Sequence, residues 1–259
     1  MRMGFHLGGS QSDIRQGIPF LEQNGIEVVQ IFAGSPMSLN FMKATPAYKE
    51  LVSKVDVVIH SPYWVSFFND AVFKIQKRYI QWISSEFSTL EKRIRYVTHL
   101  GYPKKQMSQE EMLNRLCEEI EGLELENLNL DLYLENSSGK GKASNPSIKY
   151  LQMIQKGMKN VYVVVDSEHA YAAGEDLSKI DVENLKLVHM NALPRYVRFG
   201  GCLDRHSWTP LSRSKEDIRV FIDRLYGRDV DLIMERRSID VALEDINSIR
   251  RRYASREES

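Results

Sequence analysis

The chain has 259 residues, of which 42% are hydrophobic and 27% charged, a composition typical of a globular protein with a sizeable core. Intrinsic disorder, a collagen-like chain and a disulfide-rich mini-protein are excluded. The 35 basic and 35 acidic residues balance, so bulk basicity does not indicate a nucleic-acid-binding protein, and any anionic partner must meet local positive charge.

The cysteines and the apolar runs predict the setting of the protein. Two cysteines, Cys117 and Cys202, cannot form a disulfide framework, which favours a reduced intracellular environment. The first apolar segment begins at Met3 without a signal-peptide pattern before it, and no apolar run approaches the roughly 18 residues of a membrane span. We therefore expect a soluble intracellular protein with no membrane partner, and the balanced charge leads us to expect a monomer.

Short β-rich segments recur from one end of the chain to the other. They lie at 3–7, 27–32, 55–60, 94–99, 130–135, 161–166, 185–190 and 230–235. They are continuously apolar rather than alternating, which is typical of parallel strands covered by helices. Helix-start signals lie between them at Thr45-Pro46, Ser108 to Glu111, Asn145-Pro146, and Ser214 to Asp217.

The alternation of strands and helices predicts the fold class. Eight β/α units in about 250 residues indicate an α/β protein with a single (β/α)8 TIM-type barrel rather than a doubly wound sheet. No linker or low-complexity tract divides the sequence, so we expect one domain over residues 1–259. The basic tail at 250–259 is interpreted as a solvated helix end rather than a nucleic-acid-binding arm.

Ionisable residues at the carboxyl ends of the predicted strands are the main functional signal. Six strands end in such a residue, and three more follow shortly after. The nine residues are His60, His99, Glu135, Asp166, His169, His189, Asp204, His206 and Glu235. In a β/α barrel these strand ends and the following loops form the active-site face. We therefore expect a metal site there, at the mouth of the barrel.

Each of these residues taken alone also fits a structural role, as a hydrogen-bonded His or a helix-capping Asp. The complete set does not, because four carboxylates buried together would be strongly destabilising without compensating cations. Imidazole and carboxylate ligands suit Zn²⁺, with Mn²⁺ or Fe²⁺ as chemically reasonable competitors. Nine ligands are too many for one zinc ion and indicate a cluster. Closely spaced metal ions serve phosphoryl displacement, which favours a phosphodiester substrate.

Several segments, spread over nearly the whole chain, are more specific than generic barrel sequence. They are GFHLGGS (4–10), QIFAGSP (30–36), HSPYWVSFFN (60–69), THLG (98–101), LYLENSSGKG (132–141), VDSEHAYAAGED (165–176), HMN (189–191), LDRH (203–206) and ME (234–235). In this order they resemble the endonuclease IV family of zinc-dependent apurinic/apyrimidinic endonucleases. The resemblance implies a xylose-isomerase-like TIM barrel with three zinc ions.

The resemblance also implies a role for each ligand. The first zinc ion would be held by His60, His99 and Glu135, the second by Glu135, Asp166, His189 and Glu235, and the third by His169, Asp204 and His206. The implied reaction is hydrolysis of the phosphodiester 5′ to an abasic site in damaged double-stranded DNA, leaving a 3′-hydroxyl and a 5′-deoxyribose phosphate. The residues expected to be catalytic are Glu135, Glu235, His60 and His99.

Aromatic residues after the third predicted strand are candidate DNA contacts. Tyr63 matches the family's Tyr that enters DNA beside the abasic site, and Trp64 adds stacking surface. Phe67 and Phe68 fit stacking on DNA and packing at the start of the following helix equally well.

Basic residues in two loops and one apolar residue complete the expected DNA contacts. The loop at 194–201 places Arg195 and Arg198 among aromatic residues, and Lys140 follows a strand end, so both segments suit phosphates. Met37 stands where many family members have a polar side chain that inserts into the duplex, which weakens phosphate steering. Ala192 stands where an acidic residue is common. These departures concern damage specificity rather than metal chemistry.

Three other functions compete with an abasic-site endonuclease. A related endonuclease acting on ultraviolet photoproducts would use similar metal geometry. A sugar isomerase shares this barrel and its carboxylate-rich site, but needs fewer histidine ligands and no aromatic DNA wedge. A damaged-DNA binding protein with a degenerate site is disfavoured because all nine ligands are intact.

Overall fold

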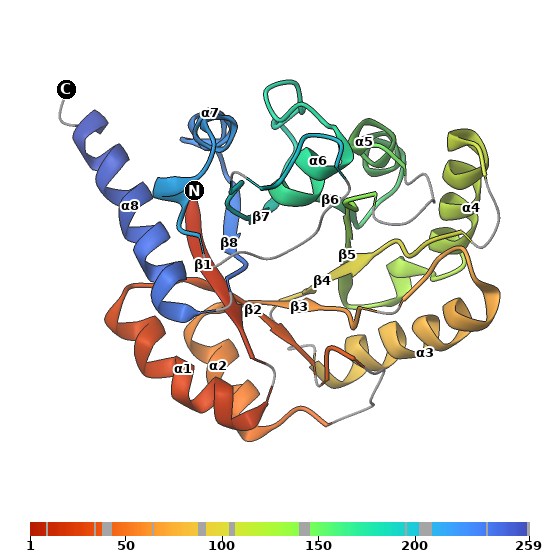
Figure 1. Ribbon diagram of the computed structural model, residues 1–259. Helices are drawn as coiled ribbons and strands as arrows, with labels where there is room; N and C mark the ends of the chain where they lie inside the picture. The colour runs from red at the N-terminus through yellow and green to blue at the C-terminus, as the bar shows by residue number, and fades with distance from the viewer. Residues whose placement is uncertain are drawn as a thin grey trace.

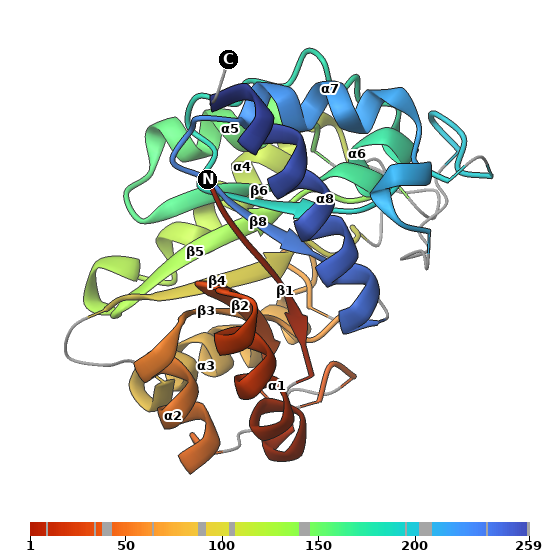
Figure 2. The same cartoon turned by 90° about the vertical axis from the view of Figure 1, so that its left-hand side faces the viewer.

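Parallel strands form a closed barrel at the centre of the molecule. The computed structural model describes residues 1–8, 10–33, 35–37, 43–63, 65–87, 92–103, 107–139, 146–194, 196–201, 209–236 and 238–257. Within these ranges, strands β1 to β8 pair in sequence order and β8 pairs with β1. Helices surround the strands (Figure 1), and Figure 2 shows the strands from the side. This is the single (β/α)8 barrel that the sequence predicts.

The strands and helices alternate along the chain. The strands are β1 (Arg2–Leu7), β2 (Val28–Phe32), β3 (Asp56–His60), β4 (Ile94–His99), β5 (Leu130–Glu135), β6 (Val161–Asp166), β7 (Leu187–Met190) and β8 (Asp231–Met234). The helices are α1 (Gln11–Gln23), α2 (Pro46–Lys54), α3 (Asp70–Phe87), α4 (Gln109–Glu121), α5 (Ile148–Gly157), α6 (Ser167–Ala173), α7 (Glu216–Leu225) and α8 (Ile239–Glu257). Each strand lies within two residues of its predicted bounds.

Two of the predicted helix starts are confirmed by their capping contacts. Thr45 caps α2, with its Oγ1 accepting a hydrogen bond from the Tyr48 amide at 3.2 Å. Ser108 and Glu111 form a capping box at the start of α4, which satisfies amides that the first helical turn leaves without partners.

The other two predicted starts are wrong. Helix α5 begins at Ile148, after an extended Ser147 whose amide donates to Gln109 Oε1 at 3.3 Å, and not at Pro146; Asn145, the expected cap, lies outside the described residues. Helix α7 begins at Glu216 with Lys215 at the cap position. The Ser214 hydroxyl instead accepts a hydrogen bond from the Leu193 amide at 2.7 Å, so a tertiary contact replaces the expected cap.

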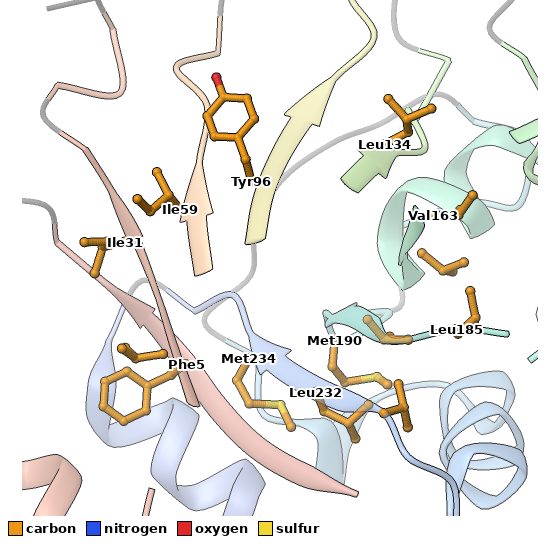
Figure 3. Packing of buried hydrophobic residues seen from close by; sticks show 14 of the residues in the cluster. Phe5, Ile31, Ile59, Tyr96, Leu134, Val163, Leu185, Met190, Leu232 and Met234 are labelled. Atoms are coloured by element: carbon orange, nitrogen blue, oxygen red, sulfur yellow. The ribbon is translucent and has the colours of Figure 1, made fainter. Parts of the chain in front are cut away.

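Alternate residues of the strands face the barrel interior and the surrounding helices. A small buried cluster consists of Val28, Val58, Val97, Tyr133, Val164, Leu187 and Ile233. Their sequence neighbours, among them Ile59, Tyr96 and Leu134 (Figure 3), belong instead to the large cluster. That cluster also contains the buried side chains of the helices. Because side chains alternate along a strand, the small cluster fills the interior of the barrel.

Charged side chains occupy the amino ends of the strands. Arg2 donates from Nε and Nη2 to the two carboxylate oxygens of Asp231, each at 2.8 Å. Arg95 also donates to Asp231, and Arg2 donates to Asp56. Polar groups at this end of a β/α barrel usually serve stability. The described helices include none that is both long and apolar enough to cross a membrane.

Candidate metal centre

The alternation of side chains along the strands brings the candidate ligands together. Each follows a residue of the interior cluster by two positions: His60 follows Val58, His99 follows Val97, Glu135 follows Tyr133, Asp166 follows Val164, His189 follows Leu187 and Glu235 follows Ile233. Residues at this spacing share one face of a strand. The candidates therefore form the next layer of the interior, at the carboxyl ends of the strands.

Glu135 lies at the centre of the cluster, and its side chain is 1% exposed. Its Oε2 is 3.1 Å from His60 Nε2 and 3.4 Å from His99 Nδ1. Its Oε1 is 3.1 Å from His189 Nδ1 and 3.4 Å from His169 Nδ1. One carboxylate thus contacts four imidazoles, each from a different strand or helix.

The ligand atoms are close enough to share metal ions. Within each of three groups they all lie within 4.8 Å of one another. The groups are His60, His99 and Glu135; Glu135, Asp166, His189 and Glu235; and His60, His189 and Glu235. Imidazole nitrogens and carboxylate oxygens form a donor set that fits zinc. Glu135 belongs to the first two groups, so the positions that they define adjoin each other.

Burial and mutual contact shift the pKa values in this cluster in opposite directions. Burial lowers the pKa of His99 to about 4, so its ring is neutral at neutral pH, as a metal ligand must be. Burial also opposes the charge on His189, but the carboxylates of Glu235 and Glu135 outweigh it and raise its pKa to about 9. Burial disfavours the Glu135 carboxylate, yet the His99 and His189 rings hold its pKa well below the usual value.

Helix α6 places His169 beside the strand-end residues. The Asp166 Oδ1 atom accepts a hydrogen bond from the His169 amide at 2.7 Å and so caps this helix. His169 Nδ1 lies 3.1 Å from the carbonyl oxygen of Asn136 and 4.0 Å from Asp166 Oδ1. The spacing of three residues between Asp166 and His169 therefore brings both side chains to one site.

Five of the expected site residues lie outside the described residues. They are Asp204 and His206, which were expected to share a zinc ion with His169, and Trp64, Lys140 and Arg195, which were expected to contact DNA. Of the three residues expected to hold the third zinc ion, the structure therefore describes only His169.

Gln30 on β2 joins the cluster, and the sequence analysis missed it. Its Nε2 lies 2.7 Å from Glu235 Oε1 and 3.0 Å from His6 Nδ1, and its Oε1 lies 2.8 Å from His189 Nε2. Because a carboxylate accepts hydrogen bonds, the Gln30 nitrogen donates to Glu235 and its oxygen accepts from His189 Nε2. His189 then keeps Nδ1, the nitrogen nearest Glu135, for a metal ion.

A signal for Gln30 was present in the sequence. It follows the interior residue Val28 by two positions, as the six strand-end candidates follow theirs. His6, the one histidine that the sequence analysis left outside the set, stands two positions after Gly4 on β1. Its ring centroid lies 6.4 Å from that of His60.

Exposed aromatic and apolar side chains lie on the loops that follow β2, β3 and β4. The Tyr63 side chain is 50% exposed, and its ring centroid lies 6.2 Å from that of His60 and 6.1 Å from that of His99. Its amide donates to the Pro36 carbonyl at 2.9 Å, which connects the loops after β2 and β3. Met37 is 69% exposed on the first of these loops. Tyr102, which the sequence analysis did not single out, is exposed after β4.

The described part of the loop at 194–201 contains one residue that packs inside the protein and others whose side chains are exposed. Val197 is buried, and its carbonyl accepts a hydrogen bond from the Lys215 ammonium. The Phe199 ring packs edge-on against Tyr171 with centroids 5.3 Å apart. Arg198 is exposed, as a DNA contact requires.

Phe67 and Ala192 have structural roles. Phe67 is completely buried and packs against Phe73, with ring centroids 5.4 Å apart, so of its two proposed roles packing is correct. Ala192 is also completely buried and belongs to the large hydrophobic cluster. An acidic side chain at that position would need a partner within the core.

Comparisons with known proteins relate the sequence and the fold of this chain to known ones. No protein-family model matches the chain. The chain is similar to a protein named "Probable endonuclease 4" from Natranaerobius thermophilus, with 28% identity over 80% of this chain and 80% of that protein. It is also similar to the crystal structure of endonuclease IV from Thermus thermophilus, with a TM-score of 0.75, 22% identity and 100% coverage of both chains.

A sugar epimerase shares the barrel as well. The structure of an L-ribulose 3-epimerase has a TM-score of 0.63 and 14% identity to this chain, covering 96% of this chain and 86% of the epimerase. The similarity to the Natranaerobius protein confirms the resemblance in sequence to the endonuclease IV family, and the solved structures confirm the fold.

Proposed function

We propose that this chain, which resembles the endonuclease IV family in sequence and in fold, is a DNA-repair endonuclease that acts at abasic sites. In this proposal it hydrolyses the phosphodiester 5′ to the abasic site of double-stranded DNA and leaves a 3′-hydroxyl and a 5′-deoxyribose phosphate. The observation that carries the proposal is the cluster around Glu135, in which one carboxylate contacts four imidazoles.

We propose that the cluster binds three zinc ions, with Mn²⁺ and Fe²⁺ as competitors. The ligands would be His60, His99 and Glu135 for the first; Glu135, Asp166, His189 and Glu235 for the second; and His169, Asp204 and His206 for the third. The grouping of ligand atoms supports the first two sets. When bound, zinc ions supply water that ionises near neutral pH and positive charge for the phosphoryl oxygens.

The protein's own residues orient these ligands and shape the charge of the site. Glu135 joins the first two ligand sets, and Gln30 fixes the ring of His189. Three dications would outweigh the charges of the four carboxylates among the nine ligands, so the mouth would be positive although the chain has no net charge. This local charge would attract a phosphodiester and would account for DNA binding by a protein of balanced composition.

The exposed side chains around the mouth suit distorted DNA. Tyr63 stands beside His60 and His99 with half of its side chain exposed, in position to stack on a nucleotide at the metal ions. Met37 presents an apolar side chain that fits between bases, as wedge residues do. Arg198 and, outside the described residues, Trp64, Lys140 and Arg195 complete the proposed DNA contacts.

The decisive experiment is cleavage of a labelled duplex that contains one tetrahydrofuran abasic analogue, which cannot undergo lyase cleavage. An undamaged duplex, a photoproduct duplex and a chelator-treated protein restored with zinc serve as comparisons. We expect a zinc-dependent nick 5′ to the analogue with a 3′-hydroxyl end.

Other results would redirect the proposal. Cleavage confined to the photoproduct duplex would replace the substrate while retaining the metal chemistry. No cleavage of any duplex, together with epimerisation or isomerisation of sugars, would place the chain with the sugar-converting proteins that share its fold.

A further inference from the structure

A buried network of hydrogen-bonded polar residues connects helix α8 to the candidate metal ligands. Arg236 donates from Nε to Asp245 Oδ2 at 2.7 Å and from Nη1 to Asn191 Oδ1 at 3.3 Å. Asn191 donates from Nδ2 to Asp166 Oδ2 at 2.7 Å. All four residues are buried, and the Arg236 side chain is 0% exposed. Neither Arg236 nor Asp245 belongs to one of the ligand groups, so this ion pair is not part of the candidate metal centre itself.

The hydrogen bonds of this network permit only one orientation of the Asn191 side-chain amide. A guanidinium only donates and a carboxylate only accepts. The amide oxygen must therefore face Arg236, and the amide nitrogen must face Asp166. Arg236 thus holds Asn191 in the orientation in which it donates to the candidate ligand.

Both carboxylate oxygens of Asp166 are held in this arrangement. Oδ1 accepts from the His169 amide and Oδ2 from Asn191, each at 2.7 Å. Each oxygen has a further lone pair, so the carboxylate is oriented while it can still bind a metal ion. Arg236 also directly follows Glu235, so its anchoring to α8 restrains a second candidate ligand.

Asp245 Oδ1 also accepts a hydrogen bond from the Leu211 amide at 2.6 Å, a structural contact that explains the carboxylate but not the buried guanidinium beside it. Removing two charges from water costs free energy that their attraction often fails to recover, and apolar pairs of similar volume are frequently as stable. The Arg236 Nη2 atom is buried and has no hydrogen-bond partner among the described residues, which adds to this cost. A role in orienting the ligands accounts for the placement of the guanidinium at this point.

We propose that Arg236, held by Asp245 and acting through Asn191, is a positioning residue for Asp166 and Glu235. It sets the affinity for the zinc ion that these residues share with His189, without touching that ion. The inference rests on the proposed function only in requiring that the cluster binds zinc. Partners of metal ligands typically contribute about 10- to 100-fold to metal affinity.

The test is a zinc titration of the chelator-treated full-length protein against a competing chromophoric chelator. The variant Asp166→Asn first identifies the binding step that depends on Asp166. The double variant Arg236→Met/Asp245→Leu replaces the ion pair with an apolar pair, and its melting temperature is measured in parallel. We expect a folded protein in which that step is about 10- to 100-fold weaker, while steps unaffected by Asp166→Asn are unchanged.

A control variant tests whether removing any ion pair on α8 changes zinc binding, and a further variant tests the network without removing the buried ion pair. Arg252→Met/Asp223→Leu removes the exposed ion pair between α8 and α7, whose Nη2 to Oδ2 distance is 2.8 Å, and should leave all zinc steps unchanged. If the first double variant fails to fold, Asn191→Leu leaves the ion pair in place and should weaken the same step. Unchanged affinity in a folded Arg236→Met/Asp245→Leu protein, or in Asn191→Leu, overturns the inference. No zinc binding by the unaltered protein overturns the proposed metal cluster instead.

Discussion

Gln30 Oε1 lies 2.8 Å from His189 Nε2, so a neutral amide on β2 fixes the ring of a candidate metal ligand on β7. The nitrogen of the same amide donates to Glu235. Gln30 is therefore hydrogen-bonded to both His189 and Glu235, which belong to the same ligand group. An amide is itself a poor zinc ligand. Its contribution to metal binding is expected to be orientation.

This relationship predicts the effect of Gln30→Met, which keeps the length of the side chain and removes its hydrogen bonds. Zinc affinity should fall by about 10- to 100-fold, because His189 and Glu235 lose a shared orienting partner. Calorimetric titration of the metal-free protein measures the change. Gln16→Met, at an exposed position of α1, is the matched control and should bind zinc normally. Normal affinity in Gln30→Met would show that the amide is dispensable.

Glu135→Gln tests the central carboxylate. The substitution preserves shape but removes the charge that contacts four imidazoles, so the first two metal positions should lose their shared ligand. We expect nicking of the abasic-analogue duplex to fall by more than the roughly 100-fold that loss of an outer partner costs. Zinc content and circular dichroism report binding and folding separately. Activity comparable to that of the unaltered protein, with the fold intact, would contradict the proposed mechanism.

The two shifted histidines predict how the stability of the metal-free protein depends on pH. His99 has an ordinary pKa of 6.5 and a folded pKa of about 4, so its contribution is complete above pH 6.5 and is lost as the pH falls toward 4. His189 has a folded pKa of about 9, so its contribution is complete below pH 6.5 and is lost as the pH rises through 9. Their combined contribution is greatest near pH 6.5.

Urea unfolding in the presence of a chelator, between pH 5 and pH 9, measures how the free energy of unfolding falls on the acidic and on the alkaline side of pH 6.5. His189→Asn should reduce the loss of stability above pH 6.5, and His99→Asn should reduce the loss below it. An alkaline loss that is equally large in His189→Asn would assign it to another group.

Tyr63 provides the test of DNA contact. Stacking of a base on an aromatic ring contributes about 1–3 kcal/mol, so Tyr63→Ala should raise the KM for the damaged duplex by roughly 5- to 150-fold. Tyr63→Phe keeps the ring and should behave almost normally. Phe20→Ala removes a comparably exposed ring on α1 and serves as the control. Zinc affinity should stay unchanged in all three, and a normal KM for Tyr63→Ala would remove this residue from the interface.

Local patterns predicted much of the fold and of the candidate site. Strands β4, β5 and β6 begin and end at the predicted bounds, because most of their residues are buried and apolar and the few polar ones, such as Arg95 and Asp131, do not interrupt the pattern. His99, Glu135 and Asp166 were recognisable as the ionisable residues that terminate those runs. Gln30 escaped notice because an uncharged residue within a strand resembles ordinary sequence.

The sequence by itself determined where the strands lie along the chain and which types of side chain stand at their carboxyl ends, since buried strands are visible as apolar runs in the local sequence. Only the tertiary structure decided which side chains meet. Glu135 contacts His60 and His189, which are 75 and 54 residues away, because pairing of β8 with β1 closes the barrel and brings the strand ends into one layer. The link from Gln30 on β2 to His189 on β7 likewise depends on that closure. The link from Arg236 to Asp166 through Asn191 follows instead from the pairing of β6, β7 and β8 side by side, which also leaves no local pattern in the sequence.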